Sequence, residues 1–437
     1  MNLTIIGTGF VGVVSSGVFA SFGNIVYGLD IDQKKVDMLT RAEIPFYEPG
    51  LEQLVKEGVA KKTLTFTTDY TKAIPSSDVI MIAVGTPSAM DGQADLTYVF
   101  AAAKSLAPHL KDGAIVAVKS TVPPGTCDKV AQVIRDNGGT KPFHVVSLPE
   151  FLKEGSAVED TLHPDRIIIG ATDAMVIEKL KELHKPLGAP VVVMKPESAQ
   201  MCKYTSNAYL ATRITFINQI ANLCEANGAN IQEVIAGIGL DKRIGKHYWY
   251  PGLGYGGSCF PKDVKELAAY AKAIGQENNL MVTVSTLNEE RMVSLLSTFE
   301  QQVGGWKGKT VAVLGLSFKP NTNDMREAPS TKAVPALLAA GAVVHSYDPM
   351  TNEEAARYFG SQKLSNFSNY HMATSVDEAL KGAHVALVLV EWPQLITLEP
   401  SHIKELMVPN AIFIDCRDQY DRAEIEKVGL KYIGIGL

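Results

Sequence analysis

Short apolar runs alternate with longer helical patterns along the first half of the chain. The runs occupy residues 3–6, 25–30, 78–84, 114–119 and 145–147, and residues 13–22 between the first two read as a small-residue helix ending at Gly23. Short buried runs that alternate with helical segments are typical of βα units with a parallel sheet. The first half therefore predicts a doubly wound α/β domain.

The hydrophobic pattern changes at Ser198. Residues 198–226 contain no proline or glycine, Gly228 follows them, and apolar side chains recur every three or four positions. This pattern predicts one helix of roughly 30 residues, about 45 Å long at the standard rise. A helix of this length usually bridges domains or builds a subunit interface. Several shorter helices are expected between residues 228 and 288.

The α/β pattern restarts at Thr310, after a glycine-rich linker at residues 304–308. Apolar runs at residues 311–314, 343–348, 384–390 and 411–415 repeat the plan of the first half, and residues 330–340 predict a helix that ends at Gly341. We predict an α/β fold with two Rossmann-like doubly wound domains, joined by a long central helix and a small helical domain. The expected domain boundaries are 1–197, 198–300 and 301–437.

Composition and charge narrow the function classes. The 437 residues are 46% hydrophobic and 20% charged, with a net charge of −6, as in an ordinary globular protein. No overall basic field is present to attract nucleic acid or an anionic membrane. The chain shows no signal-peptide pattern and no apolar run of membrane-spanning length. Its five scattered cysteines lack the CxxC spacing, so we predict no metal site and no disulfide framework, and a cytoplasmic location fits best.

A glycine-rich turn at residues 7–12 follows the first predicted strand and opens the first helix. Gly7 makes the turn, Gly9 admits a pyrophosphate and Gly12 lets the helix pack on the strand, while the helix N-terminus faces the phosphate charge. Asp30 ends the second strand, where an acid binds the ribose 2′-hydroxyl and favours NAD over NADP. The alternative is a glycine-rich turn that binds nothing.

Polar and charged side chains follow several of the other predicted strands. They are Thr86, Thr121, Glu150 and Glu154 in the first half, and Lys319, Arg326 and Arg417 in the second. Ligands of doubly wound sheets bind at the carboxyl ends of strands, and the three cations could meet phosphate there. Taken singly, each side chain could equally be a helix cap, a turn residue or a surface cation.

The segment from Gly252 to Asp263 combines glycines with a cysteine, and we call residues 252–259 the cysteine loop. Cys259 precedes a predicted helix and neighbours Lys262, and both features favour the reactive thiolate. Asp263 could move a proton or steer a water. Lys203 and Asn207 share one helix face and could hold an oxyanion. The alternatives are a buried structural cysteine and a solvated helix face.

Together these features resemble the nucleotide-sugar 6-dehydrogenases, the UDP-glucose/GDP-mannose dehydrogenase family, over essentially the whole chain. The motifs lie at residues 7–12, 119–123, 149–155, 203–207, 243–245, 256–263, 318–322, 325–327 and 415–417. Residues 44–50 and 243–260 favour UDP-glucose as the substrate, with GDP-mannose or a UDP-N-acetylhexosamine as the alternatives. Leu148 departs from the family pattern, which usually has asparagine before Pro149.

The resemblance implies a four-electron oxidation that reduces two NAD+. The C6 hydroxyl loses a hydride, Cys259 attacks the resulting aldehyde, a second hydride transfer gives a thioester, and water releases UDP-glucuronate. By the same resemblance Lys203 and Asn207 stabilise oxyanions, and Glu150, Asp263 and, through a water, Thr121 move protons. The rival readings are a two-electron hydroxyacid dehydrogenase and a non-catalytic NAD- or nucleotide-binding regulator.

The resemblance also implies the binding residues. The NAD contacts are Gly7, Gly9, Phe10, Val11, Gly12, Asp30, Lys35, Thr86, Thr121, Glu154, Lys262 and Arg326. The sugar-nucleotide contacts are Glu150, Phe151, Leu152, Lys203, Asn207, Arg243, Tyr248, Gly252, Gly256, Lys319 and Arg417. Arg243 is expected to reach the site of a neighbouring subunit, which implies an obligate homodimer built on the long helix.

Overall fold

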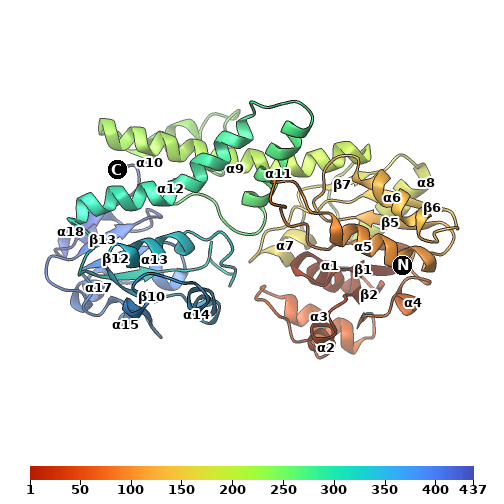
Figure 1. Ribbon diagram of the computed structural model, residues 1–437, viewed down its shortest axis with the longest axis horizontal. Helices are drawn as coiled ribbons and strands as arrows, with labels where there is room; N and C mark the ends of the chain where they lie inside the picture. Colours follow the sequence, from red (N-terminus) through yellow and green to blue (C-terminus); the bar gives the residue numbers. More distant parts are fainter. The chain divides into compact units, whose positions relative to one another are not determined.

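The computed structural model describes residues 1–437 and divides into two compact units (Figure 1). Unit 1 comprises Met1–Ser206 and Lys265–Glu277, and unit 2 comprises Asn207–Val264 and Asn278–Leu437. Each unit is built around one sheet. Residues 198–300, predicted as a central helical domain, are divided between the two units, and the three domain boundaries stay a prediction.

Unit 1 contains an eight-stranded sheet in the order β3-β2-β1-β4-β5-β6-β7-β8. Its strands are β1 (Asn2–Ile6), β2 (Ile25–Leu29), β3 (Leu64–Thr67), β4 (Val79–Ile82), β5 (Ala114–Val118), β6 (Phe143–Ser147), β7 (Ile167–Gly170) and β8 (Val191–Met194). All neighbours pair in parallel except β6 and β7. The strand order reverses beside β1, which is the doubly wound topology predicted for the first half.

The alternation of side chains along the strands explains why both faces of this sheet carry a core. On β5, Ile115 and Ala117 belong to one apolar cluster, while Ala114, Val116 and Val118 belong to another. Helices α1 (Phe10–Ser21), α3 (Leu51–Ala60) and α8 (Ala174–His184) contribute to the first cluster, and α5 (Thr97–Leu106) and α6 (Thr126–Asp136) to the second. The shorter helices of unit 1 are α2 (Gln33–Thr40), α4 (Tyr70–Ala73), α7 (Ala157–Leu162), η1 (Ala107–His109) and η2 (Lys185–Leu187). Such two-sided burial produces the continuous apolar runs seen in the sequence.

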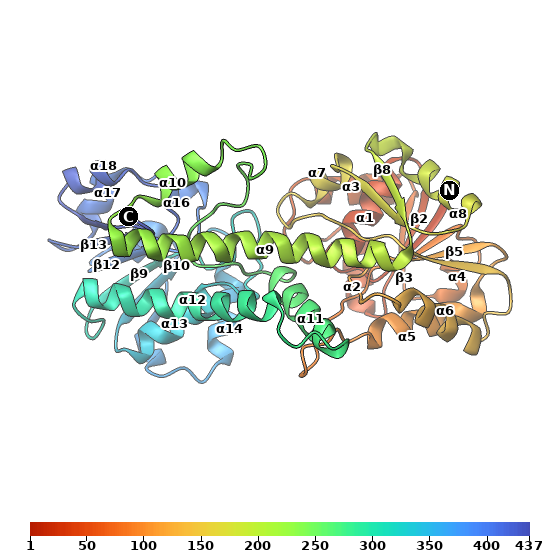
Figure 2. The same ribbon diagram turned by 90° about the horizontal axis from the view of Figure 1, so that it is seen from above.

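Helix α9 (Pro196–Asn227) is a single helix of 32 residues, as predicted (Figure 2). Pro196 opens it, because the fixed φ of proline suits the first helical position, and Gly228 follows its end with φ +78°. The unit boundary falls inside α9, between Ser206 and Asn207, and again inside α11 (Phe260–Ala273), between Val264 and Lys265. No helix of the chain combines the length and the apolar character needed to cross a membrane.

Unit 2 contains a six-stranded parallel sheet in the order β11-β10-β9-β12-β13-β14, which repeats the plan of unit 1. The strands are β9 (Thr310–Leu314), β10 (Val343–Tyr347), β11 (Tyr370–Met372), β12 (Val385–Val388), β13 (Ile412–Asp415) and β14 (Lys431–Ile433). The helices are α10 (Ile231–Ile238), α12 (Leu280–Val303), α13 (Ser330–Ala339), α14 (Asn352–Ser361), η3 (Phe367–Asn369), α15 (Val376–Leu380), α16 (Pro393–Ile396), α17 (Pro400–Leu406) and α18 (Arg422–Lys427). The predicted fold class, two parallel-sheet domains with a long central helix, is confirmed.

Candidate active site

The glycine turn of unit 1 has the shape that a dinucleotide requires. A Cβ on Gly12 would overlap the carbonyl oxygen of Gly7, so helix α1 packs against the turn only because residue 12 is glycine. A Cβ on Gly9, by contrast, would meet no protein atom within 4 Å. The chain's own packing therefore does not demand a glycine at position 9, whereas a pyrophosphate close to this backbone would. No side chain caps the N-terminus of α1, which leaves its amide groups for the phosphates.

Asp30 lies directly after β2 and is 9% exposed. Its Oδ2 accepts hydrogen bonds from the backbone N–H of Thr8, at 2.8 Å, and from the Thr8 hydroxyl, at 2.7 Å. The Lys35 ammonium on α2 lies 3.5 Å from the same oxygen. Burial alone would raise the pKa of Asp30, but the hydrogen bonds from Thr8 and Asp32 and the charge of Lys35 lower it. The carboxylate is thus held ionised at the sheet edge, where it can accept hydrogen bonds.

Two predicted cofactor residues from neighbouring strand ends contact each other. The Thr86 hydroxyl, after β4, donates to the Thr121 carbonyl oxygen, after β5, at 3.0 Å. Thr86 is buried and Thr121 is half-buried. The remaining glycine-turn residues, Phe10 and Val11, are half-buried in the first turn of α1, and the Phe10 ring lies 4.9 Å from that of Phe46.

A buried ion pair joins two predicted catalytic residues of unit 1. The Lys203 ammonium lies 3.0 Å from Glu150 Oε1, and the two side chains are 4% and 9% exposed. The second oxygen of Glu150 accepts the backbone N–H of Leu152 at 2.8 Å. Lys119, directly after β5, is affected by the same charges. Burial and the Lys203 cation lower its pKa to about 8, while the Glu150 carboxylate opposes that shift. Three charged groups therefore converge where β5 and β6 end.

The loop after β6 is anchored on both sides of Glu150. The Phe151 ring has the Arg166 guanidinium carbon 3.7 Å from its centroid and the Lys203 ammonium 5.4 Å away. Leu152 packs against the apolar core, and Glu154 is half-buried. Leu148, which departs from the family pattern, is buried in that core.

Glu48 holds the end of the same loop. Its buried carboxylate accepts the backbone N–H groups of Gly155 and Ala157, each at 2.7 Å, and of Val158, at 3.4 Å. A carboxylate at the first turn of α7 satisfies amide groups that the helix leaves open. The segment 44–50 is thereby tied to the loop that carries Glu154.

In unit 2, α9 and α11 bring three predicted residues into contact. Asn207 Nδ2 donates to Asp263 Oδ2 at 2.5 Å, and the Lys262 ammonium lies 2.6 Å from Asp263 Oδ1. Asp263 is 1% exposed. Cys259 directly precedes α11, its carbonyl oxygen accepts the N–H of Asp263 at 2.8 Å, and its Sγ lies 3.6 Å from the Ser258 hydroxyl. A half-buried thiol thus lies at a helix N-terminus one turn before a buried carboxylate.

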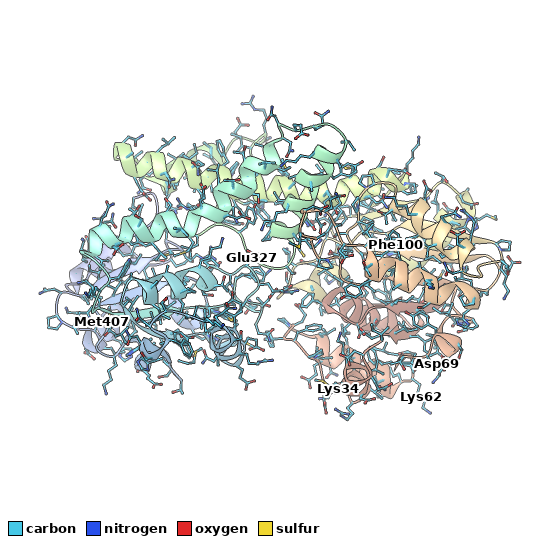
Figure 3. All side chains as sticks on the ribbon, in the orientation of Figure 1. Lys34, Lys62, Asp69, Phe100, Glu327 and Met407 are labelled. Atoms are coloured by element: carbon cyan, nitrogen blue, oxygen red, sulfur yellow. The ribbon has the colours of Figure 1, made fainter.

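The glycines of the cysteine loop are explained by what packs against them. A Cβ on Gly252 would lie 3.0 Å from the Cys416 carbonyl oxygen and 3.4 Å from Arg417 Nη1. A Cβ on Gly256 would overlap the carbonyl oxygen of Glu327, which is labelled in Figure 3. The cysteine loop therefore packs directly on the loops that follow β9 and β13.

The cations of those loops have acidic or aromatic neighbours. Arg417 Nε lies 2.8 Å from Glu391 Oε2 and donates to the Leu389 carbonyl oxygen at 2.9 Å. Arg326 pairs with Asp324 at 2.8 Å, and the Lys319 ammonium lies 5.3 Å from the Phe318 ring centroid. These loops and the cysteine loop together form the candidate site of unit 2.

Two further predicted contacts lie on the segment before the cysteine loop. Tyr248 has φ +64°, and its ring lies 6.4 Å from that of Phe260, next to Cys259. Arg243, in contrast, has a side chain that is 89% exposed, and its guanidinium lies 2.6 Å from the carboxylate of the nearby Asp241. Arg243 therefore extends into solvent on this chain.

Sequence reasoning did not single out every residue that shapes these sites. Lys119 and Glu48 lie inside the segments 119–123 and 44–50, and a charged residue inside such a segment is a signal that points to them. Asn288 and Arg291, which contact the cysteine loop from α12, had no such signal, because they follow an ordinary helical pattern.

Comparison with known proteins decides the family. Residues 1–188 match the NAD binding domain of the UDP-glucose/GDP-mannose dehydrogenase family, residues 197–290 its central domain and residues 312–422 its UDP binding domain. The chain belongs to the UDP-glucose/GDP-mannose dehydrogenase family. The predicted resemblance and the NAD cofactor are confirmed, and the open glycine turn and ionised Asp30 of unit 1 fit that cofactor.

The family's relatives span the whole chain. UDP-glucose 6-dehydrogenase TuaD of Bacillus subtilis is 43% identical over 100% of this chain and 93% of the relative, and UDP-glucose 6-dehydrogenase of Rhizobium meliloti is 42% identical over 100% and 99%. Among solved structures, a UDP-glucose dehydrogenase from Pyrobaculum islandicum aligns with a TM-score of 0.91 at 36% identity, covering 100% of this chain and 97% of that one. The UDP-N-acetyl-mannosamine dehydrogenase Cap5O of Staphylococcus aureus aligns at 0.79 with 27% identity, covering 100% and 98%.

Proposed function

We propose that the protein oxidises UDP-glucose at C6 to UDP-glucuronate, with two NAD+ reduced for each substrate molecule. The observation that carries this proposal is the full-length similarity, at 36–43% identity, to proteins named UDP-glucose 6-dehydrogenase. Solved relatives named for N-acetylated sugars or for GDP-mannose share the fold at lower identity, 24–29%. The proposed substrate is therefore UDP-glucose rather than GDP-mannose or a UDP-N-acetylhexosamine.

Bound NAD+ accepts one hydride in each of the two oxidation steps. In unit 1 we assign Gly7, Gly9 and Gly12 to the pyrophosphate and Asp30, with Lys35, to the adenosine ribose. Phe10, Val11, Thr86, Thr121 and Glu154 complete the unit 1 contacts to the cofactor, and Lys262 and Arg326 of unit 2 are assigned to it as well. The Thr86–Thr121 hydrogen bond supports this assignment, because it fixes two strand ends at the cofactor edge of the sheet.

Cys259 is the proposed nucleophile. Its sulfur adds to the C6 aldehyde to give a thiohemiacetal, loss of a hydride gives the thioester, and water releases the carboxylate and the thiol. Asp263 and Glu150 move protons, with Thr121 acting through a water, and Lys203 and Asn207 stabilise the oxyanions. The Asn207–Asp263 and Lys203–Glu150 contacts support these roles, since each pairs an oxyanion-stabilising group with a carboxylate.

The remaining assigned residues hold the sugar nucleotide. Glu150, Phe151 and Leu152 come from the loop after β6, and Tyr248, Gly252 and Gly256 from the segment that leads to Cys259. Lys319 and Arg417 follow strands of the UDP binding domain, where cations favour a diphosphate. Lys203 and Asn207 contribute from α9.

The first test measures NADH formed per UDP-glucose consumed to completion, with the product identified by mass. Two NADH and UDP-glucuronate are expected. One NADH would indicate a two-electron dehydrogenase, and no NADH with UDP-glucose but two with another nucleotide sugar would change the substrate. A Cys259→Ser variant is expected to stop acid formation, and full conversion by this variant would contradict the covalent mechanism.

We further propose that the protein is a homodimer built on α9. Three large side chains, Tyr209, Phe216 and Leu223, recur at seven-residue spacing on this helix and are 57%, 52% and 60% exposed. Residues seven apart lie on one helix face, so the chain leaves an apolar stripe largely exposed. The exposed Arg243 is available to reach the site of the second copy. Light scattering should give a dimer mass, and Phe216→Glu should give a monomer, whereas the control Tyr98→Glu, which changes an exposed aromatic on α5, should not; a dimeric Phe216→Glu variant would contradict this assignment.

We expect the protein in the cytoplasm, because NAD+ and sugar nucleotides are its proposed substrates. Cell fractionation tests this expectation.

A further inference from the structure

The backbone of the cysteine loop is held by side chains from two helices of unit 2. At Gly252, the N–H donates to Asn218 Oδ1 of α9 at 2.8 Å, and the carbonyl oxygen accepts from Arg291 Nε of α12 at 2.8 Å. At Tyr255, the N–H donates to Asn288 Oδ1 at 2.8 Å, and the carbonyl oxygen accepts from Asn288 Nδ2 at 2.9 Å. The backbone N–H and carbonyl oxygen of both Gly252 and Tyr255 are therefore bonded to side chains rather than to a neighbouring strand or helical turn.

Asn288 acts as a backbone mimic. An amide side chain that both donates to and accepts from one residue reproduces the pairing of a neighbouring strand. Gly254 lies so close to it that a Cβ at this position would be 2.5 Å from Asn288 Oδ1. Its φ of +92° belongs to the left-handed region that only glycine adopts easily. The loop and Asn288 are thus fitted to each other.

Arg291 is an unusual residue to find at this place. It is 4% exposed, packs among the apolar residues of α12, and burial lowers the pKa of its guanidinium while the nearby Glu225 opposes that shift. Besides its bond to Gly252, it donates through Nη1 to Asn222 Oδ1 of α9, and its Nη2 has no hydrogen-bond partner. Burying a guanidinium costs stability unless it is fully paired, so apolar packing alone does not explain an arginine here.

The opposite side of the loop is also fixed. The Gly257 N–H donates to the Arg326 carbonyl oxygen at 2.9 Å, and a Cβ at Gly257 would lie 2.7 Å from the Phe318 ring. The loop is therefore enclosed by α12 on one side and by the loop after β9 on the other. Two residues later, Cys259 leads into α11. The placement of the thiol depends on this enclosure.

We propose that Asn288 and Arg291, one turn apart on α12, are positioning residues that hold the cysteine loop so that the Cys259 sulfur can reach the substrate carbon. Neither residue is among the assigned catalytic or binding groups. The proposal rests on the proposed function for the identity of that carbon, but the effect on the thiol can be measured without any substrate. A displacement of a reacting group by about 1 Å can lower a rate by roughly 100-fold, so a loosened loop has a measurable effect.

The experiment compares Asn288→Leu and Arg291→Met with the conservative variants Asn288→Asp and Arg291→Lys. Asp retains the acceptor for the Tyr255 N–H, and Lys retains a cation that can donate to the Gly252 carbonyl oxygen. Asn288→Leu and Arg291→Met are expected to lower kcat by about 10- to 100-fold with the KM for NAD+ within about twofold of the unmodified enzyme, because most of the assigned cofactor contacts, including the glycine turn and Asp30, belong to unit 1. Asn288→Asp and Arg291→Lys are expected to retain part of the kcat that Asn288→Leu and Arg291→Met lose. Thr298→Ala is the control, since its hydroxyl bonds only its own helix, at Ser294 O.

The second readout is the rate at which iodoacetamide alkylates Cys259, followed by mass spectrometry of the peptide that contains it. Leu and Met at positions 288 and 291 are expected to change this rate at least about threefold, and Thr298→Ala is expected to leave it unchanged. Unchanged kcat, or a lower kcat with unchanged alkylation in all four variants, would overturn the proposal. If the unmodified enzyme failed to oxidise UDP-glucose, the proposed function would fall, while the alkylation rates would still decide whether Asn288 and Arg291 position the thiol.

Discussion

Replacing Glu150 by Gln removes the counterion of Lys203 while preserving the size of the side chain. The pair is 3.0 Å apart, and both side chains are less than 10% exposed. At this distance two unit charges attract by about 5 kcal/mol when the effective dielectric constant is about 20. Much of that attraction offsets the desolvation of the two groups, and removing one partner of a buried pair typically costs about 3–5 kcal/mol. We expect Glu150→Gln to lower the free energy of unfolding by about 3 kcal/mol.

The neighbouring Lys119 increases this cost. Glu150 is the group that raises the pKa of Lys119, while burial and Lys203 lower it to about 8. Without Glu150 the carboxylate that raises the pKa of Lys119 is lost while the Lys203 cation remains nearby, so the pKa of Lys119 should fall below that value. The loss of stability should therefore be larger at pH 6, where both lysines are charged, than at pH 9, where Lys119 has lost its proton.

The assay is urea unfolding of Glu150→Gln, Lys203→Met and the double variant, followed by circular dichroism. A double-variant cycle should give a coupling energy of about 2 kcal/mol. The control is Glu52→Gln, which breaks the exposed Lys56–Glu52 pair, at 2.8 Å, and should change stability by less than about 0.5 kcal/mol. Additive effects of the two single changes, or equal effects of Glu150→Gln and Glu52→Gln, would refute the reasoning.

Three other changes test separate parts of the structure. Asp30→Ala should raise the KM for NAD+ about tenfold and allow turnover with NADP+, because it removes a charged acceptor; unchanged cofactor preference in initial rates would contradict this role. Burial lowers the pKa of His184 to about 4, so the stability of its neutral form is present above pH 6.5 and is lost as the pH falls through 4. His184→Leu should therefore reduce the pH dependence of unfolding in that window by about 3 kcal/mol, and an unaltered acid transition would count against it. Gly254→Ala should lower stability by about 1–3 kcal/mol in thermal unfolding, since its φ is +92° and its Cβ would crowd Asn288; an unchanged Tm would argue against that strain.

The sequence predicted the central strands of both sheets except β7 and missed all four edge strands. The strands β1, β4, β5, β9 and β12 are buried along most of their length, and continuous apolar runs revealed them. In the edge strand β8, buried and exposed side chains do not alternate, because the successive residues Val192 and Val193 are both exposed. The edge strands β3, β11 and β14 have only three or four residues. A short strand that pairs with a neighbour on one side only carries too few apolar residues for its hydrophobic pattern to be recognised. β7 is different, because its three successive isoleucines are typical of a buried strand and could have predicted it.

The residues of the candidate site were predicted better than their contacts. Helical spacing correctly places Lys203 and Asn207 one turn apart on α9, since that relation is local. The partners of the two side chains, Glu150 and Asp263, are 53 and 56 residues away along the chain. Such pairs arise where strands end at one sheet edge or where two helices cross, and no residue spacing encodes them. Only the resemblance to a family linked these motifs before the fold was known.

The two acids that end the second strand of each sheet show why position in a motif does not fix a role. Asp348 ends β10 as Asp30 ends β2, and in both the Oδ2 atom accepts from the loop after the first strand. Asp348 Oδ2, however, receives the N–H groups of Leu316 and Ser317 and also the indole N–H of Trp392, at 3.1 Å, and the residue is 1% exposed. Asp348 Oδ1 also accepts the N–H groups of Met350 and Thr351, so both of its oxygens are occupied, whereas Oδ1 of Asp30 accepts one N–H, that of Asp32, and Asp30 lies nearer the surface. Acids at equivalent places in the two sheets therefore differ in their remaining hydrogen-bonding capacity: Asp348 is occupied by groups of its own unit, whereas Asp30 keeps an acceptor position that fits its proposed role at the cofactor. Part of that difference is the indole of Trp392, which follows β12 and which no glycine fingerprint reveals.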